Sequence, residues 1–236
     1  MDVPEGGRRR DRLRAATEAE IKAAAWRLIA EGGPDGLSLR AIARDVGMAN
    51  GTVYGYYAGR DELITALISD AYEELVARLS ESMGDLRGAD RVLAYGRSFR
   101  EWAVERPDLF RLVYGDPVAG YRPPVGGAAP AAEARACGLL IDIVQDMPPA
   151  MAERSPDANW EDFEPEFVVE ARAAHPGLTA AALATVFRVW GRLHGLVALE
   201  LHGHLRGRVR RTARIYEGEL KELALSVAGP PRSDSS

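Results

Sequence analysis

Apolar residues recur along the chain at spacings of three and four, and no segment shows strand alternation bounded by turn residues. The first helical segment spans about 12–31 and is ended by the glycine- and proline-rich stretch 32–36. Its apolar face consists of Ile21, Ala25, Leu28 and Ile29. Because this spacing matches one side of an α-helix, the pattern predicts an all-α protein.

Two short helices and one long helix are expected next. Ser38 is a suitable N-cap for a helix that ends near Asp45, and Gly47 lets the backbone turn before a very short helix at about 50–56. The long helix opens at 60–62, where two acids suit the positive end of a helix. Its apolar stripe comprises Leu63, Ile64, Leu67, Ile68, Ala71, Tyr72, Leu75, Val76 and Leu79. Two short helices joined by a glycine turn predict a helix-turn-helix, which fits the major groove of DNA.

The rest of the chain is predicted to be helical. Further helices are expected at about 89–105, 107–114, 131–147, 179–205 and 209–228. The stretch 115–130 is expected to be a loop, and 148–177 a long connection with one or two helical turns. These elements predict a three-helix head at 1–60, a helical body at 61–228 that begins with the long helix, and a disordered tail at 229–236.

Charge is distributed unevenly along the chain. The 236 residues carry a net charge of −5, but residues 8–60 hold ten basic and six acidic side chains, a net +4, so the remainder sums to −9. A basic head on an acidic body would contact phosphate with one end only. The triplet Arg8-Arg9-Arg10 is either a disordered arm that grips phosphate or the minor groove, or a tail that only aids solubility.

The sequence argues against several other classes of protein. No apolar stretch follows the arginine triplet as in a secretory signal, and no apolar run approaches the length of a membrane span. The single Cys137 cannot form an intrachain disulfide, which fits a reducing compartment. Together these features lead us to expect a cytoplasmic protein with no membrane partner. Because nucleophile motifs, phosphate-binding glycine loops and Cys/His metal spacings are missing, we expect no enzyme, no cofactor and no metal site.

A specific arrangement of residues lies in and around the helix-turn-helix. It comprises Leu39-Arg40-Ala41-Ile42-Ala43, Val46-Gly47-Met48, Gly51-Thr52-Val53-Tyr54, Tyr56-Tyr57 and Arg60-Asp61-Glu62-Leu63. In spacing, residue type and position near the N-terminus, this arrangement resembles the TetR family of bacterial regulators. The resemblance covers roughly a quarter of the chain. It implies a DNA-binding domain at 1–60 and an effector-binding and dimerisation domain at 61–228.

The resemblance implies DNA contacts at seven positions, which are Arg40, Asn50, Gly51, Thr52, Tyr54, Tyr56 and Arg60. Asn50 to Thr52 open the recognition helix, the two tyrosines resemble phosphate contacts, and Arg60 resembles a backbone anchor beside the fourth helix. Arg40 resembles a base or phosphate contact, with a solvated helix residue as the alternative. Val53, Tyr57 and Leu63 are expected in the small core instead.

Two departures from the family pattern fall in the recognition helix. Ala49 stands where the family usually has a Ser or Thr N-cap, so Asn50 is an alternative cap that would move the helix start by one residue. Gly55 occupies a position that is often aromatic or His, so one potential contact is missing.

A second recognisable stretch begins at Trp190 and includes His194-Gly195, which resembles a Trp-x-x-x-His-Gly signature of one TetR body type. His194 is either a hydrogen-bonded interior or interface residue, or a ligand contact. In the family the last two helices pair with their copies, which implies a homodimer on a palindromic operator. The expected apolar seam is Leu183, Phe187, Leu220, Leu223 and Val227. The basic run 206–211 is expected to be a solvated connection.

An effector pocket is implied inside the body. Its expected lining is Phe99, Trp102, Phe110, Tyr114, Phe187, Trp190 and His194, with plain core as the alternative for the aromatic residues. No cluster of like charges marks a charged ligand, so an apolar effector is expected. The leading hypothesis is a repressor released from DNA by that effector, and the alternative is an architectural DNA-binding protein without ligand control.

Overall fold

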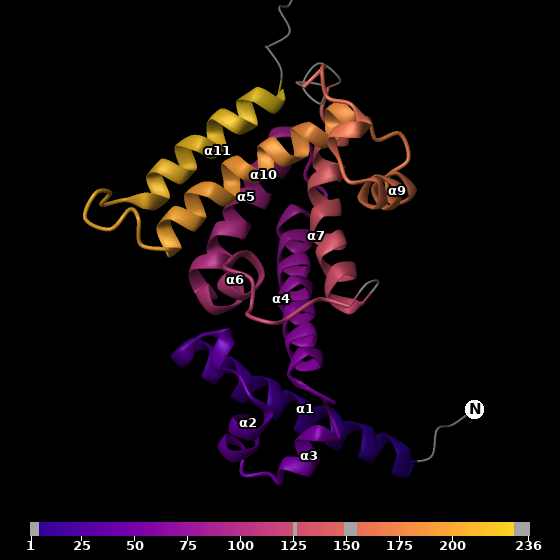
Figure 1. Cartoon of the computed structure of the whole chain (residues 1–236). Coiled ribbons are helices and arrows are strands. Elements are labelled where there is room, and N and C mark those ends of the chain that lie inside the picture. The colour runs from indigo at the N-terminus through magenta and orange to yellow at the C-terminus, as the bar shows by residue number, and fades with distance from the viewer. Residues whose placement is uncertain (1–4, 125–126, 149–154, 229–236) are drawn as a thin grey trace, which may run out of the picture. The chain divides into compact units, whose positions relative to one another are not determined.

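The computed structural model describes residues 5–124, 127–148 and 155–228, and every regular element in these ranges is helical (Figure 1). In chain order the elements are α1 (Glu5–Gly32), η1 (Pro34–Gly36), α2 (Leu39–Asp45), α3 (Asn50–Tyr54), α4 (Arg60–Met83), α5 (Gly88–Glu105), α6 (Pro107–Tyr114), α7 (Ala128–Gln145), η2 (Trp160–Asp162), α9 (Pro165–Ala174), α10 (Ala180–Leu201) and α11 (Thr212–Ala228), where η denotes a 3-10 helix. The predicted all-α fold class is confirmed.

The described chain forms two compact units. The first runs from α1 to Tyr72 and adds Asp108–Ala131, and the second combines Glu73–Pro107 with the chain from Ala132 to the end of α11. The first half of α4 therefore belongs to one unit and the second half to the other. The first unit is larger than the head predicted at 1–60, since it also contains most of α6 and the segment after it. The predicted tail at 229–236 lies outside the described residues.

Local signals define both ends of α2. The Ser38 hydroxyl accepts a hydrogen bond from the Ala41 backbone N–H at 3.2 Å, as expected of an N-cap. At the other end Gly47 adopts a φ of 68°, and the Met48 N–H donates to the Ala43 carbonyl at 2.9 Å. This is the Schellman pattern, which needs a left-handed residue that glycine provides with little strain. The turn of the helix-turn-helix is therefore determined by Gly47.

Several element boundaries differ from the predicted ones. α3 ends at Tyr54 and is preceded by Ala49 as N-cap, without a side-chain bond, so the alternative cap Asn50 is instead the first helical residue. α1 starts at Glu5 rather than near 12, because the arginine-rich segment is also helical. The connection predicted with one or two turns contains the ten-residue helix α9.

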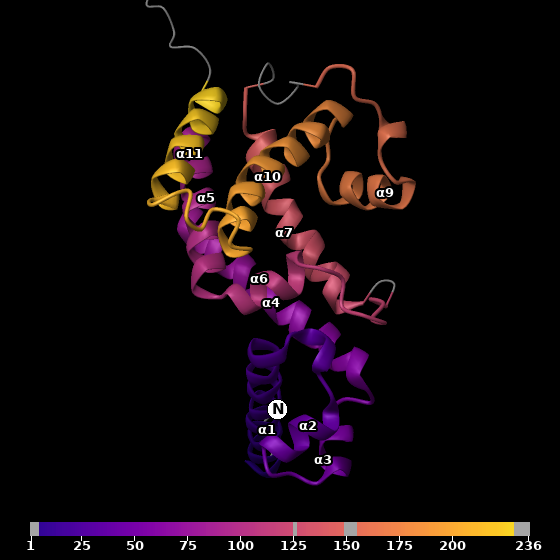
Figure 2. The ribbon, with the colours of Figure 1, turned by 60° about the vertical axis from the view of Figure 1, so that its left-hand side comes forward.

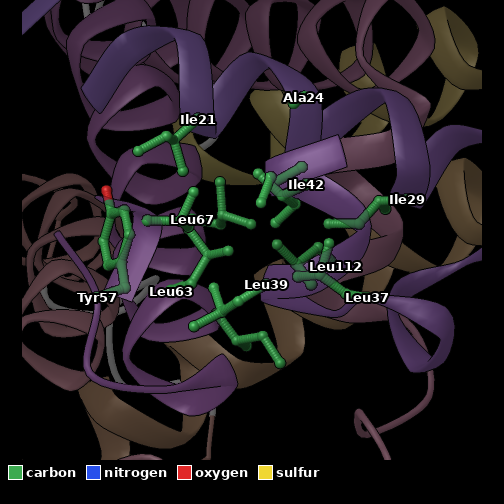
Figure 3. Close-up of a cluster of buried hydrophobic side chains, with 14 of the residues drawn as sticks. Ile21, Ala24, Ile29, Leu37, Leu39, Ile42, Tyr57, Leu63, Leu67 and Leu112 are labelled. Carbon is green, nitrogen blue, oxygen red and sulfur yellow. The ribbon is translucent and has the colours of Figure 1, made fainter. Parts of the chain in front are cut away.

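The core of the first unit lies between α1, α2 and α4 (Figure 3). Its buried members include Ile21, Ala24, Ala25, Ile29, Leu39, Ile42, Val53, Tyr57, Leu63 and Leu67. Val53, Tyr57 and Leu63 are thus core residues, as predicted. Leu112 of α6 and Val118 of the following segment also belong to this core, which explains why they join the first unit.

In the second unit α11 packs against α5 and α10 (Figure 2). Gly96 of α5 makes the close approach possible, because a Cβ at this position would lie 2.2 Å from a methyl carbon of Leu220. The Tyr216 hydroxyl donates to the Gly96 carbonyl at 3.0 Å. The Arg100 guanidinium makes a bidentate pair with Glu200 at 2.7 and 2.9 Å, which ties α5 to the end of α10.

This packing overturns most of the predicted dimer seam. Leu183, Leu220 and Leu223 are at most 2% exposed and pack inside the second unit, so assigning them to an intermolecular seam was wrong. Phe187 remains 42% exposed. The side chain of Val227 lies outside the described residues. Apolar periodicity marks a covered face, but it does not show whether the same chain or a copy covers it.

Candidate functional site

The outer face of the helix-turn-helix is formed by α3. Val53 is fully buried, whereas Asn50, Gly51, Thr52 and Tyr54 are exposed. The side chains of Asn50, Thr52 and Tyr54 make no hydrogen bond to any other residue in the described ranges. Because one residue of α3 anchors the helix and its neighbours point outward, this face can present polar groups to base edges in a major groove.

Arg40 lies in the first turn of α2 and is exposed. It has no ion pair with any described residue, in contrast to Arg27, which pairs with Asp45 at 2.5 Å. A guanidinium with this freedom can fork onto guanine or onto phosphate. Its position is thus compatible with the predicted DNA contact as well as with the solvated alternative.

The two adjacent tyrosines after α3 have different environments. Tyr57 is 4% exposed, its hydroxyl donates to Glu18 at 3.2 Å, and burial together with that carboxylate raises its pKa. Tyr56 is only half-buried, and the Arg14 guanidinium lies 5.0 Å from its ring centroid. Tyr57 is therefore a structural residue that ties α1 to α3, while Tyr56 is accessible beside the end of α3.

Arg60 makes three hydrogen bonds to backbone carbonyls. Its Nε donates to Leu37 at 3.1 Å, its Nη2 to Pro34 at 3.1 Å and its Nη1 to Ala119 at 3.2 Å. The Ala119 N–H in turn donates to Asp35 at 2.9 Å. Arg60 thus fastens segment 115–121 to the loop between α1 and α2. The sequence does not predict this role, because Arg60 and Ala119 are 59 positions apart.

Substitutions at Arg60 and Asp35 separate this fastening role from the predicted phosphate contact. Both Arg60→Ala and Asp35→Ala remove a bond to Ala119, so each should lower the free energy of unfolding by about 1–3 kcal/mol in denaturant titrations. Only Arg60→Ala removes a cation. If Arg60 also touches phosphate, its loss should reduce the slope of log affinity against log salt by about 1 per protomer. Equal slopes for both variants would contradict a phosphate contact.

The seven residues predicted to line an effector pocket fall into three aromatic clusters. Phe99, Trp102, Trp190 and His194 belong to one cluster in the second unit, where His194 lies 4.9 Å from Trp190 and 6.4 Å from Phe99 between ring centroids. Phe110 and Tyr114 belong to the first unit, with centroids 5.3 Å apart. Phe187 forms a third cluster on the surface of α10. The predicted set is therefore not a single group within either unit.

Each cluster contains aromatic residues that the sequence did not single out. Tyr95 stacks on Phe99 at 6.5 Å, and Tyr72 meets Tyr114 edge-on at 6.0 Å. Phe163 and Phe167 lie 6.1 and 6.0 Å from Phe187. Tyr95 is four residues before Phe99 on the same helix, so helical spacing could have indicated it. Phe163 and Phe167 come from the connection predicted to be mostly irregular, and spacing alone could not place them.

Burial divides the first cluster into a core part and an accessible part. Trp102 is 0% exposed, and its indole N–H donates to Glu74 at 3.2 Å. Trp190 and His194 are half-buried, and burial, followed by the nearby His202, lowers the pKa of His194. Three open grooves of about 330, 340 and 440 Å³ lie elsewhere in the second unit. None of the seven predicted residues lines any of these three grooves.

Two observations on the described residues concern metal binding and thiol reactivity. These residues contain no group of three or more His, Cys, Asp or Glu side chains that could hold a metal ion. Burial raises the pKa of the Cys137 thiol to about 11, with a contribution from Glu133, so the thiol stays protonated near neutral pH. The distinctive feature is instead the exposed face of α3.

Comparison with known proteins identifies the family. Residues 21–67 match the bacterial regulatory proteins of the tetR family, and residues 92–223 match the tetracyclin repressor-like C-terminal domain. The HTH-type transcriptional regulator Rv1816 of Mycobacterium tuberculosis is 33% identical over 208 residues, which cover 84% of this chain and 85% of the relative. The chain belongs to the TetR family. It is a DNA-binding transcriptional regulator, and homodimers are typical of this family.

Solved structures agree with this assignment. The crystal structure of the regulatory protein SCO4313 is 31% identical, with a TM-score of 0.73 over 94% of this chain and 98% of that one. The transcriptional regulator FadR from Bacillus subtilis shares the fold, with a TM-score of 0.60, 15% identity and coverage of 90% and 99%. Across the described part of this TetR-family regulator, no helix is long and apolar enough to span a membrane.

Proposed function

We propose that this TetR-family regulator is a homodimeric repressor that binds a palindromic operator through two α3 helices and releases it when a small apolar effector binds the body. The observation that carries the DNA-binding part is the outward face of α3, where Asn50, Thr52 and Tyr54 are exposed over a buried Val53. Arg40 adds an exposed cation on α2. Two such heads would occupy half-sites about 34–36 Å apart.

The outer faces of α10 and α11 support the dimer. Apolar and small residues follow helical spacing on the outer sides of both helices. Gly195 is half-buried, and the exposed members are Phe187, Gly191, Leu199, Ile215, Gly218 and Leu225. A Cβ added at any of the three glycines would meet no atom within 4 Å, so no neighbour in the chain requires them. Glycine inside a helix costs about 1 kcal/mol relative to alanine. A helix of a second copy that approaches this face closely would account for these glycines.

The effector part of the proposal concerns Trp190 and His194. They are the half-buried members of the aromatic cluster and belong to α10, while Phe99 and Trp102 form its buried wall. FadR from Bacillus subtilis, which shares the fold, was crystallised in complex with stearoyl-CoA, so a protein of this architecture can bind a ligand that carries a long apolar acyl chain. Because α4 contributes to both compact units, a ligand that shifts α4 would also move the head.

Selection of bound fragments from the native genome tests the regulatory function. We expect enrichment of a palindrome with half-sites about one DNA turn apart. Deleting the gene should raise transcription next to the selected sites. Failure to enrich any sequence would contradict sequence-specific binding, and lower transcription after deletion would contradict a repressor.

Arg40→Ala tests base reading at the selected operator. If Arg40 forks onto a base, its loss should remove about 1–3 kcal/mol of base discrimination per half-site, measured by binding to operators with single base changes. Arg122→Ala is the matched control, because Arg122 is also an exposed arginine of the first unit but lies outside the helix-turn-helix. An equal loss of affinity for every operator variant would instead assign Arg40 to phosphate.

A further inference from the structure

The positive charge of the head is concentrated at the start of α1. Residues 5–14 contain five arginines against Glu5 and Asp11, a net charge of +3. Residues 15–60, which contain the helix-turn-helix, hold five basic and five acidic side chains and are neutral overall. The net positive charge predicted for the head therefore comes from the arginine-rich segment.

Most basic residues of the helix-turn-helix region already have partners within the chain. Lys22 pairs with Asp70 at 2.7 Å, Arg27 pairs with Asp45, and Arg60 is bonded to three carbonyls. Proteins attract DNA mainly by neutralising its phosphates with cations. A neutral region with most of its cations engaged would attract DNA weakly, so additional cations near α3 are needed.

The start of α1 provides these cations on an exposed helical segment. Residues 9–16 are exposed, including Leu13 at 69%, and α1 first enters the core at Ile21. Arg14 lies over the ring of Tyr56, two residues beyond the end of α3. Figures 1 and 2 both show the N-terminal end of α1 at the same end of the first unit as α3. Arg14 therefore lies beside the face predicted to read bases, and Arg9 and Arg10 precede it on the same exposed helical segment.

The helical conformation also limits which part of DNA the segment can contact. The triplet Arg8-Arg9-Arg10 is not a disordered arm, because α1 is helical from Glu5 onward. A helix is about 10–12 Å wide, whereas the minor groove of DNA is about 6 Å wide. The helical segment therefore cannot enter the minor groove, as an extended arm could.

We propose that residues 9–14 of α1 form a second DNA-contacting element, which binds the phosphates that flank the bases read by α3. The element rests on the proposed DNA-binding function and adds backbone affinity without sequence preference. Its contacts come from Arg9, Arg10 and Arg14, whose guanidinium groups reach the duplex beside Tyr56.

The test compares three triple variants with the wild-type protein, on a duplex selected by the wild type from the native genome and on a scrambled duplex of equal length. Arg9→Gln/Arg10→Gln/Arg14→Gln should reduce the slope of log affinity against log salt by about 2–3 per protomer on both duplexes. Arg206→Gln/Arg210→Gln/Arg211→Gln removes the same charge from exposed arginines of the second unit and should leave the slope unchanged. Arg9→Lys/Arg10→Lys/Arg14→Lys keeps the charge and should also keep the slope.

Circular dichroism and thermal unfolding should give wild-type values for all three variants, because the substituted side chains are exposed. The proposal would be overturned if the α1 glutamine variant kept the wild-type slope. It would also be overturned if the Arg206/Arg210/Arg211 control or the lysine variant lost as much slope as the α1 glutamine variant. These outcomes leave the proposed function intact as long as the wild type enriches DNA. If the wild type selects no DNA, the proposed function fails, and the DNA-contacting element that rests on it is overturned as well.

Discussion

The double variant Leu199→Glu/Ile215→Glu is expected to be monomeric and to bind the selected operator roughly 10²–10⁴-fold more weakly than the wild type. Leu199 and Ile215 are 42% and 47% exposed on the outer faces of α10 and α11, where the proposed dimer forms. In a two-fold interface each new carboxylate would be buried without a partner, close to those of the other copy. Loss of the dimer removes the gain from binding two half-sites together. Light scattering at micromolar concentration should then give 25.6 kDa instead of about twice that mass.

The matched control for this variant is Val104→Glu/Val169→Glu. Val104 and Val169 are 42% and 69% exposed on α5 and α9, so the control adds the same charge to exposed apolar positions of the same unit. It should remain a dimer with nearly wild-type operator affinity. A monomeric control, or a double variant of α10 and α11 that stays dimeric, would contradict the proposed interface.

Trp102→Ala is expected to destabilise the protein by about 3–5 kcal/mol, which corresponds to a fall of roughly 6–20 °C in the unfolding temperature. Trp102 is fully buried, packs near Phe99 and donates a hydrogen bond to Glu74. Its truncation leaves a cavity and a carboxylate that loses one donor. Differential scanning calorimetry measures the effect. A change below about 1 kcal/mol would mean that the ring borders a space that was already open.

Trp190→Ala tests whether the half-buried part of the aromatic cluster binds an effector. Apolar compounds are first screened against the wild type by thermal shift, where a ligand at 100 times its Kd should add about 2.7 kcal/mol. Trp190→Ala should weaken that ligand, whereas Trp160→Ala, which removes a half-buried ring packed near Phe163, should not. Operator DNA and ligand should weaken each other by the same factor. A tight ligand that leaves operator affinity unchanged would contradict the release mechanism.

The sequence was most informative where short-range interactions decide the structure. The N-cap at Ser38 and the left-handed turn at Gly47 depend on residues within five positions, so the helix-turn-helix was predictable almost residue by residue. Val53, Tyr57 and Leu63 were also predicted to lie in the small core, and the structure buries all three. The TetR family could be inferred from this region because its geometry and its motif lie in one continuous segment.

Periodicity was less informative where the partner of a face had to be known. Leu183, Leu220 and Leu223 were wrongly assigned to an interface with a second copy, since an apolar face is satisfied by any complementary surface. The contact between Gly96 and Leu220 shows why this face of α11 is covered by the same chain. Because Gly96 has no side chain, α11 can pack closely against α5.

By itself, the sequence determined the all-α fold, the helix-turn-helix and the family, because these depend on local backbone preferences and on a motif of fixed spacing. Only the tertiary structure decided which leucines are buried within the chain and which carbonyl groups accept hydrogen bonds from Arg60. It also placed Arg14 of α1 over the ring of Tyr56, just beyond the end of α3. Such contacts join residues tens of positions apart, and their free energy depends on three-dimensional packing that no local pattern encodes.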